Sequence, residues 1–306
     1  MTGNFKTIGL IILVMLSFTL FAGCTGSDTG QTGDQTATAT QTATPATGTE
    51  SKGDVSIGYV LWDSEIASTN VLKQTFEKAG YNVELYAVDA GPLYQALADG
   101  DVDCSVSAWL PSTQANYWDE YGNEIDLVGR NMEGTKIGLV VPTYVTIDSI
   151  EELNGVADQF DSTITGIEPG AGIMQNTEDA IDEYGLDYSL LSSSSAGMTA
   201  ELSKAYKDKD WVVVTGWTPH WMFSRYDLKY LKDPKGVFGG DEYIATLARQ
   251  GLKEDKPEVY AILQNFNWTA DDMSAVMLDI EGGASEDEAA VAWIDANEET
   301  VNGWIS

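Results

Sequence analysis

The chain has 306 residues, and its 16 Lys plus Arg against 48 Asp plus Glu give a formal net charge of −32. Such a chain lacks the clustered basic side chains that bind nucleic acid or an anionic membrane surface, so we expect no nucleic-acid partner. Its 43% hydrophobic residues suffice for a packed core, and the length favours about two domains. Two cysteines and one histidine predict no disulfide framework, metal site or other cofactor.

The first 23 residues have the organisation of a secretory signal. Lys6 is their only charge, an apolar run covers residues 8–16, and small residues precede Cys24. This junction resembles the lipobox of exported lipoproteins, which implies that Cys24 carries a lipid and holds the protein at the outer face of the cell membrane. A plain cleaved signal or a single membrane anchor is the alternative. The Thr-rich residues 24–53 lack apolar periodicity and predict a flexible linker.

From residue 54 onward, apolar runs alternate with amphipathic stretches. The pattern predicts a buried strand over 55–61 and further strands over 83–88 and 104–109, with helices over 66–79 and 91–99 between them. The pattern then recurs, with strands over 136–142, 164–167 and 211–216, a helix over 173–184, and helices within 257–305. Alternation of this kind is typical of parallel sheets whose faces are covered by helices.

Two similar halves followed by a helical tail predict an α/β fold of two lobes, each a βα sandwich, with a ligand cleft between them. We predict the first lobe over 54–142, the second over 143–243, and a return to the first lobe over 244–306.

Three of the nine tryptophans, Trp62, Trp109 and Trp217, fall at the ends of predicted strands. Carboxyl ends of parallel strands face the ligand crevice, so these rings are predicted to line one pocket, with ordinary core packing as the alternative. An indole face attracts cations, and a quaternary ammonium suits it best because it has no N–H group to satisfy. A carboxylate bound among these rings would instead be desolvated without a partner. Sugar stacking is the rival use of such rings.

Long motifs surround these tryptophans. They are YVLWDSEIAST at 59–69, SAWLP at 107–111, TGIEPGAGIM at 165–174 and VTGWTPHWMF at 214–223, with LKDPK at 231–235 and FNW at 266–268. Together they resemble the glycine betaine-binding proteins of osmoprotectant ABC importers over essentially all of 54–306. The resemblance implies a periplasmic-binding-protein-like fold of type II. It also implies capture of glycine betaine, proline betaine or a related betaine, and delivery to a transmembrane permease.

The same resemblance assigns the ends of the ligand. It places the trimethylammonium group among Trp62, Trp109 and Trp217, and the carboxylate on the backbone N–H groups of Gly172 and Ile173. The local sequence agrees, because Gly-Ala-Gly permits close backbone approach and a helix N-terminus favours an anion.

Two further positions are predicted to support the site. Gln114 stands where the family often has a histidine, and its side-chain N–H can still donate to the ligand carboxylate without adding charge. His220 is expected to support the cage from behind, with surface exposure as the alternative.

An exported hydrolase using Asp63 and Glu65 is the alternative class of protein. Residues two apart at a helix start do not face each other, and one histidine leaves little scope for a Ser-His-Asp arrangement. The sequence therefore predicts no enzyme and no catalytic residue. Choline is a further candidate ligand, but it lacks a carboxylate for the Gly172–Ile173 site.

Overall fold

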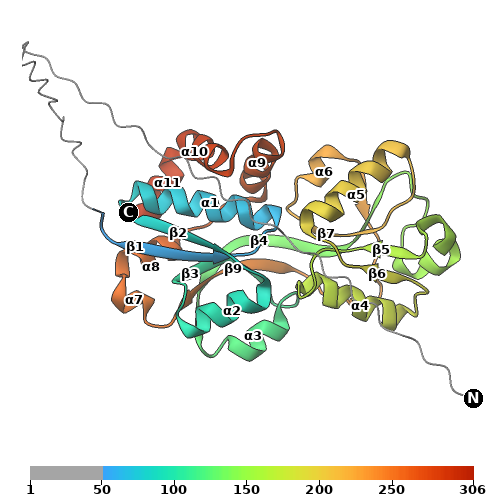
Figure 1. Ribbon diagram of the computed structural model, residues 1–306, viewed down its shortest axis with the longest axis horizontal. Coiled ribbons are helices and arrows are strands. Elements are labelled where there is room, and N and C mark those ends of the chain that lie inside the picture. The colour runs from blue at the N-terminus through green and yellow to red at the C-terminus, as the bar shows by residue number, and fades with distance from the viewer. Residues whose placement is uncertain (1–50) are drawn as a thin grey trace, which may run out of the picture. The chain divides into compact units, whose positions relative to one another are not determined.

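The computed structural model describes residues 51–306, shown in Figure 1. The predicted signal segment, Cys24 and the linker up to residue 50 lie outside the described residues. Within the described range, no helix has the length and apolar character needed to span a bilayer.

One group of elements is built around the strands β1, β2, β3 and β9, and we call it the first lobe (Figure 1). Its members are β1 (Asp54–Tyr59), α1 (Asp63–Lys78), β2 (Asn82–Ala87), α2 (Ala90–Asp99), β3 (Cys104–Leu110), α3 (Ala115–Tyr121), the first part of β4 (Ile125–Pro142), β9 (Glu242–Arg249), α7 (Leu252–Asp255), α8 (Pro257–Asn265), α9 (Ala270–Glu281), α10 (Glu286–Ala296) and α11 (Glu298–Ile305).

The other group, the second lobe, is built around β5, β6 and β7. It comprises the second part of β4, the 3₁₀ segment η1 (Ile150–Phe160), β5 (Thr163–Thr165), α4 (Gly172–Tyr184), β6 (Ser189–Leu191), α5 (Ser195–Asp208), β7 (Val214–Thr218), α6 (Met222–Arg225) and β8 (Leu228–Tyr230).

The strand order is β2-β1-β3-β9-β4-β7-β5-β6, with β8 paired to β4. The pairs of β1 with β2 and β3, and of β5 with β6 and β7, are parallel as predicted. Antiparallel pairs, which the sequence pattern did not indicate, adjoin these parallel ones: β9 runs antiparallel to β3 and β4, and β7 runs antiparallel to β4. Strand β4 serves both lobes. Its residues 125–135 pair with β9, and residues 136–140 pair with β7. The predicted lobe limits stay a prediction.

Local chemistry explains several element boundaries. Gly100 and Gly185 end α2 and α4 in the left-handed conformation, with φ of 78° and 58°. Helix α1 begins at Asp63, and acidic Asp63 and Glu65 in its first turn suit the positive end of the helix dipole. Capping boxes at Thr269 and Ser285 fix the starts of α9 and α10.

The core of the first lobe lies under α1, where Val71, Leu72 and Phe76 are buried. The returning helices α9 and α10 pack against α1, which places the C-terminal part of the chain on the first lobe (Figure 1). Cys104 is buried in β3, and burial raises the pKa of its thiol, so it is a core residue as predicted.

Candidate functional site

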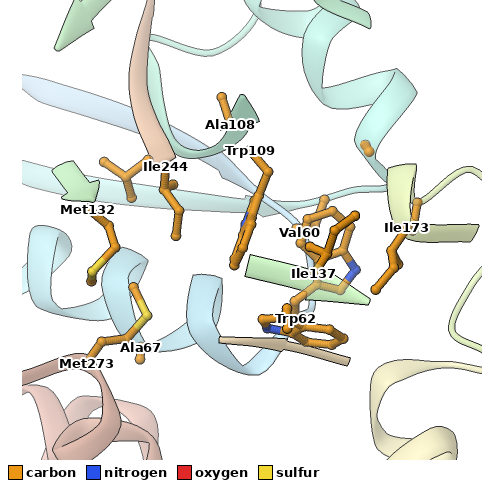
Figure 2. Packing of buried hydrophobic residues seen from close by; sticks show 14 of the residues in the cluster. Val60, Trp62, Ala67, Ala108, Trp109, Met132, Ile137, Ile173, Ile244 and Met273 are labelled. Carbon is orange, nitrogen blue, oxygen red and sulfur yellow. The ribbon is translucent and has the colours of Figure 1, made fainter. Parts of the chain in front are cut away.

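A small apolar cavity lies between the two lobes. Its cavity volume is about 20 Å³. The first lobe contributes Trp62, Trp109 and Thr113, and the second lobe contributes Ile137, Ile167, Ile173 and Trp217. Among the described residues, none of those that line it carries a carboxylate. Figure 2 shows Trp62, Ile137 and Ile173 gathered at this place, with Trp109 reaching in from β3.

The three predicted cage tryptophans therefore meet. Trp62 precedes α1 as its N-cap residue, whereas Trp109 and Trp217 are the next-to-last residues of β3 and β7. All three side chains are buried, and the ring centroids of Trp62 and Trp217 lie 6.5 Å apart with an interplanar angle of 53°. The rings of Trp62 and Trp217 are thus tilted relative to each other.

Each of these indoles is held by its N–H group. Trp109 Nε1 donates to Glu65 Oε1 at 2.7 Å, and Trp217 Nε1 donates to Ser64 Oγ at 3.1 Å. Trp62 Nε1 donates to the Glu168 carboxylate of the second lobe. Because the polar edge of each ring is engaged, the apolar faces are left to the cavity. Ser64, Glu65 and Glu168 belong to the sequence motifs, but this bonding pattern was not predicted.

Asp63 joins α1 to the second lobe. It accepts hydrogen bonds from Ser195 Oγ and Trp221 Nε1, both at 2.7 Å. His220 Nε2 lies 3.5 Å from Asp63 Oδ2. Burial alone would raise the pKa of Asp63, but the adjacent His220 and the hydrogen bonds from Ser195 and Trp221 lower it to about 2. Asp63 is therefore an ionised bridge between the lobes at neutral pH.

Glu65 is fully buried beside Asp63 on α1. Burial raises the pKa of Glu65 to about 7, although hydrogen bonds from Ser64 and Trp109 oppose this rise. The geometry gives Asp63 and Glu65 the role of hydrogen-bond acceptors for indole and hydroxyl groups, which differs from a hydrolytic pair facing a scissile bond.

His220 is 2% exposed, so the alternative of surface exposure is wrong. Its ring packs edge-on against Trp217 with centroids 4.6 Å apart. Its Nδ1 accepts from the backbone N–H of Met222 at 3.1 Å, which places the ring proton on Nε2 toward Asp63. It thus touches the cage from outside the cavity.

The start of α4 borders the same cavity. Ile173 lines the cavity, and the N-cap residue Ala171 provides no side-chain hydrogen bond to the first turn. First-turn N–H groups of a helix have no partner within the helix and attract anions. A Cβ on Gly172 would overlap the carbonyl oxygen of Thr113, so glycine permits this close approach of the lobes.

Gln114 is fully buried and does not line the cavity. Its Oε1 accepts from the Trp109 backbone N–H at 2.9 Å and from Tyr94 Oη at 3.1 Å, which fixes the turn that follows Trp109. Its Nε2 is buried without a hydrogen-bond partner. The contact of Gln114 with a ligand carboxylate stays a prediction.

Residues 51–306 contain no group of three or more His, Cys, Asp or Glu side chains arranged to hold a metal ion. Two lobes that share strand β4, with an aromatic cavity between them, define a periplasmic-binding-protein-like fold with a site for a small onium ligand.

Solved structures share this architecture. Lactococcal OpuAC, crystallised in its closed-liganded conformation with glycine betaine, is 47% identical at a TM-score of 0.80, covering 83% of this chain and 100% of that one. The glycine betaine/L-proline-binding protein ProX of Borrelia burgdorferi is 41% identical, also at a TM-score of 0.80, covering 83% and 97%.

The glycine betaine/carnitine transport binding protein GbuC of Listeria monocytogenes is 51% identical over 162 residues. That match covers 52% of this chain and 54% of the Listeria protein, so it spans about half of that relative. Residues 53–296 match the family described as the substrate-binding domain of ABC-type glycine betaine transport systems, and the chain belongs to this family. It is a binding protein of a transport system and not an enzyme.

Proposed function

We propose that the protein captures glycine betaine, or the related proline betaine, and delivers it unchanged to the permease of an ABC importer for osmoprotection. The observation that carries this proposal is the meeting of Trp62, Trp109 and Trp217 around one cavity, with each indole N–H engaged elsewhere. Ring faces attract a cation within about 6 Å, most strongly where water is excluded.

The carboxylate of the ligand would bind the backbone N–H groups of Gly172 and Ile173. The uncapped start of α4 beside the cavity supports this assignment, because a helix N-terminus stabilises an anion without a basic side chain. Choline cannot use this end of the site, so a betaine should bind more tightly than choline.

Gln114 would contribute through its unpartnered Nε2. Calorimetry of Gln114→Leu with glycine betaine and with choline tests this contact. If Gln114 donates to the ligand carboxylate, the variant should lose affinity for glycine betaine alone. If Gln114 only supports Trp109, the variant should lose affinity equally for both ligands.

Closure of the lobes would couple binding to delivery. Three contacts between the lobes support this step: Trp62 with Glu168, Asp63 with Ser195, and the Tyr117 hydroxyl with the Gly170 carbonyl at 2.8 Å. A ligand that touches both lobes shifts the population toward the closed form, which the permease would recognise.

The protein would work outside the cytoplasm, held at the membrane by a lipid on Cys24 and by the linker of residues 24–53. We base this on the signal-like start of the sequence. In the folded part, residues 54–142 and 244–306 would form the first lobe, and residues 143–243 would form the second. Mass spectrometry of the mature protein, with Cys24→Ser as the control, tests the lipid: an unmodified Cys24 would contradict it.

Calorimetric titration with glycine betaine, proline betaine and choline tests the function. We expect both betaines to bind, choline to bind more weakly, and the recovered ligand to be chemically unchanged. Absence of binding by either betaine, or conversion of the ligand, would refute the proposal.

A further inference from the structure

Glu65 is a buried carboxyl group without a basic partner. Glu65 is 0% exposed, and among the described residues the side chains that donate hydrogen bonds to its oxygens are Trp109 and Ser64. None of the ion pairs formed by the described residues includes Glu65. A buried carboxylate usually pairs with a cation, so this one calls for an explanation.

Both hydrogen bonds of Glu65 lead directly to the cavity. Trp109, which donates to Oε1, lines the cavity. Ser64, which donates to the other oxygen, accepts from Trp217, which lines the cavity as well. The Glu65 carboxyl therefore lies at the far edge of the rings whose faces would receive the ligand, in surroundings from which water is excluded.

We propose that Glu65 is the counter-charge of the bound ligand and makes the cage select a permanently cationic head over a neutral head of the same shape. This inference rests on the proposed function and names the residue behind its selectivity. The rings alone attract an onium group through their quadrupoles. A carboxylate behind Trp109 adds a full charge, which acts over a longer range and is weakly screened in the interior.

The charged groups around Glu65 do not supply this partner. On α1, Asp63 is the nearest charge, and its repulsion adds to the raised pKa of Glu65. His220 lies beside Asp63, and Glu168, from the loop before α4, accepts a hydrogen bond from Trp62. From β3 the contact is Trp109, and from β7 it is Trp217 through Ser64, neither of which carries a charge.

Ligand binding should consequently release a proton. Burial raises the pKa of Glu65 to about 7, so near neutral pH the group is partly protonated in the free protein. An onium ion in the cage favours the ionised form and lowers the pKa, so the affinity for betaine should rise as the pH increases through about 7.

The test compares glycine betaine with 3,3-dimethylbutanoate, in which a neutral tert-butyl group replaces the trimethylammonium group. Two unit charges about 8 Å apart at an effective dielectric constant of about 20 change a dissociation constant about thirtyfold. Titration calorimetry at about pH 8 should therefore show that Glu65→Gln loses about thirtyfold in betaine affinity and little for dimethylbutanoate. The exposed Glu299→Gln is the matched control and should alter neither. Equal changes for both ligands in Glu65→Gln would overturn the inference.

A second measurement needs no variant. Calorimetry of the wild-type protein at about pH 7, in two buffers of different ionisation enthalpy, counts the protons released on binding. We expect a fraction of a proton with glycine betaine and none with dimethylbutanoate, and no difference between the ligands would overturn the inference even if Glu65→Gln fails to fold. A wild-type protein that binds no betaine would refute the proposed function as well, whereas normal binding with unchanged selectivity in Glu65→Gln refutes only the role of Glu65.

Discussion

Replacing Gly172 by alanine should prevent the lobes from closing fully. A Cβ at this position would overlap the Thr113 carbonyl oxygen, and it would lie 2.7 Å from the carbonyl carbon and 2.9 Å from Cγ2 of Thr113. Non-bonded carbon atoms pack at about 3.5–4.0 Å, so the two backbone segments must separate by about 1 Å. The Gly172 N–H group remains in the variant, so any lost affinity reports the spacing of the lobes and not a lost donor.

The size of the effect follows from the atoms involved. Overpacking costs about 1–3 kcal/mol, and the upper value applies here because the obstructing group is backbone that cannot change rotamer. A cost of about 3 kcal/mol raises Kd for glycine betaine about 150-fold. The thermal stability of the unliganded protein should change little, since the contact matters only when the lobes meet.

Calorimetry with glycine betaine and thermal unfolding without it measure the two effects. Gly303→Ala is the control, because Gly303 lies in α11 with open space around its Cα, and its betaine affinity should equal that of the wild type. A Gly172→Ala protein with wild-type affinity would show that Thr113 and Gly172 do not approach in the bound state, and the reasoning would be wrong.

Three further predictions concern the cage and its carboxylates. Trp109→Ala should weaken betaine binding at least about a hundredfold, because it removes one ring face and the donor to Glu65, and near-normal affinity by calorimetry would exclude Trp109 from the cage. Asp63 has a pKa lowered to about 2, so its stabilising effect is complete above about pH 4 and is lost as the pH falls toward 2. Thermal unfolding should show this acid loss in the wild type and not in Asp63→Asn. The raised pKa of Glu65 has the opposite effect on stability. The free energy of unfolding of the unliganded protein should fall by up to about 3 kcal/mol as the pH rises from about 4.5 to about 7. Urea unfolding should find that Glu65→Gln lacks this loss, and an identical pH profile in both proteins would contradict the burial argument.

Much of the fold follows from local patterns in the sequence. Continuous apolar runs predicted β1, β2 and β3, and Gly100 marked the end of α2. The first part of β4 was missed because its pairing with β9 is interrupted by three register shifts and its buried and exposed positions do not alternate.

The cage tryptophans could be predicted because strand ends converge on one edge of a sheet. Their anchoring could not, because the partners are distant in the chain: Glu65 lies 44 residues from Trp109, Glu168 lies 106 from Trp62, and Ser64 lies 153 from Trp217. Periodicity reports which face of an element is buried and carries no information about which polar groups meet there.

The bonds between the lobes have a consequence for the speed of transport. Ser195 and Tyr117 hold the lobes together through Asp63 and the Gly170 carbonyl, yet neither lines the cavity. Cargo leaves only after such bonds break, so they govern dwell time, and differences among related complexes lie mostly in the dissociation rate. Substitution of Ser195 or Tyr117 should therefore change the rate of ligand dissociation while the ligand preference of the pocket stays as it is.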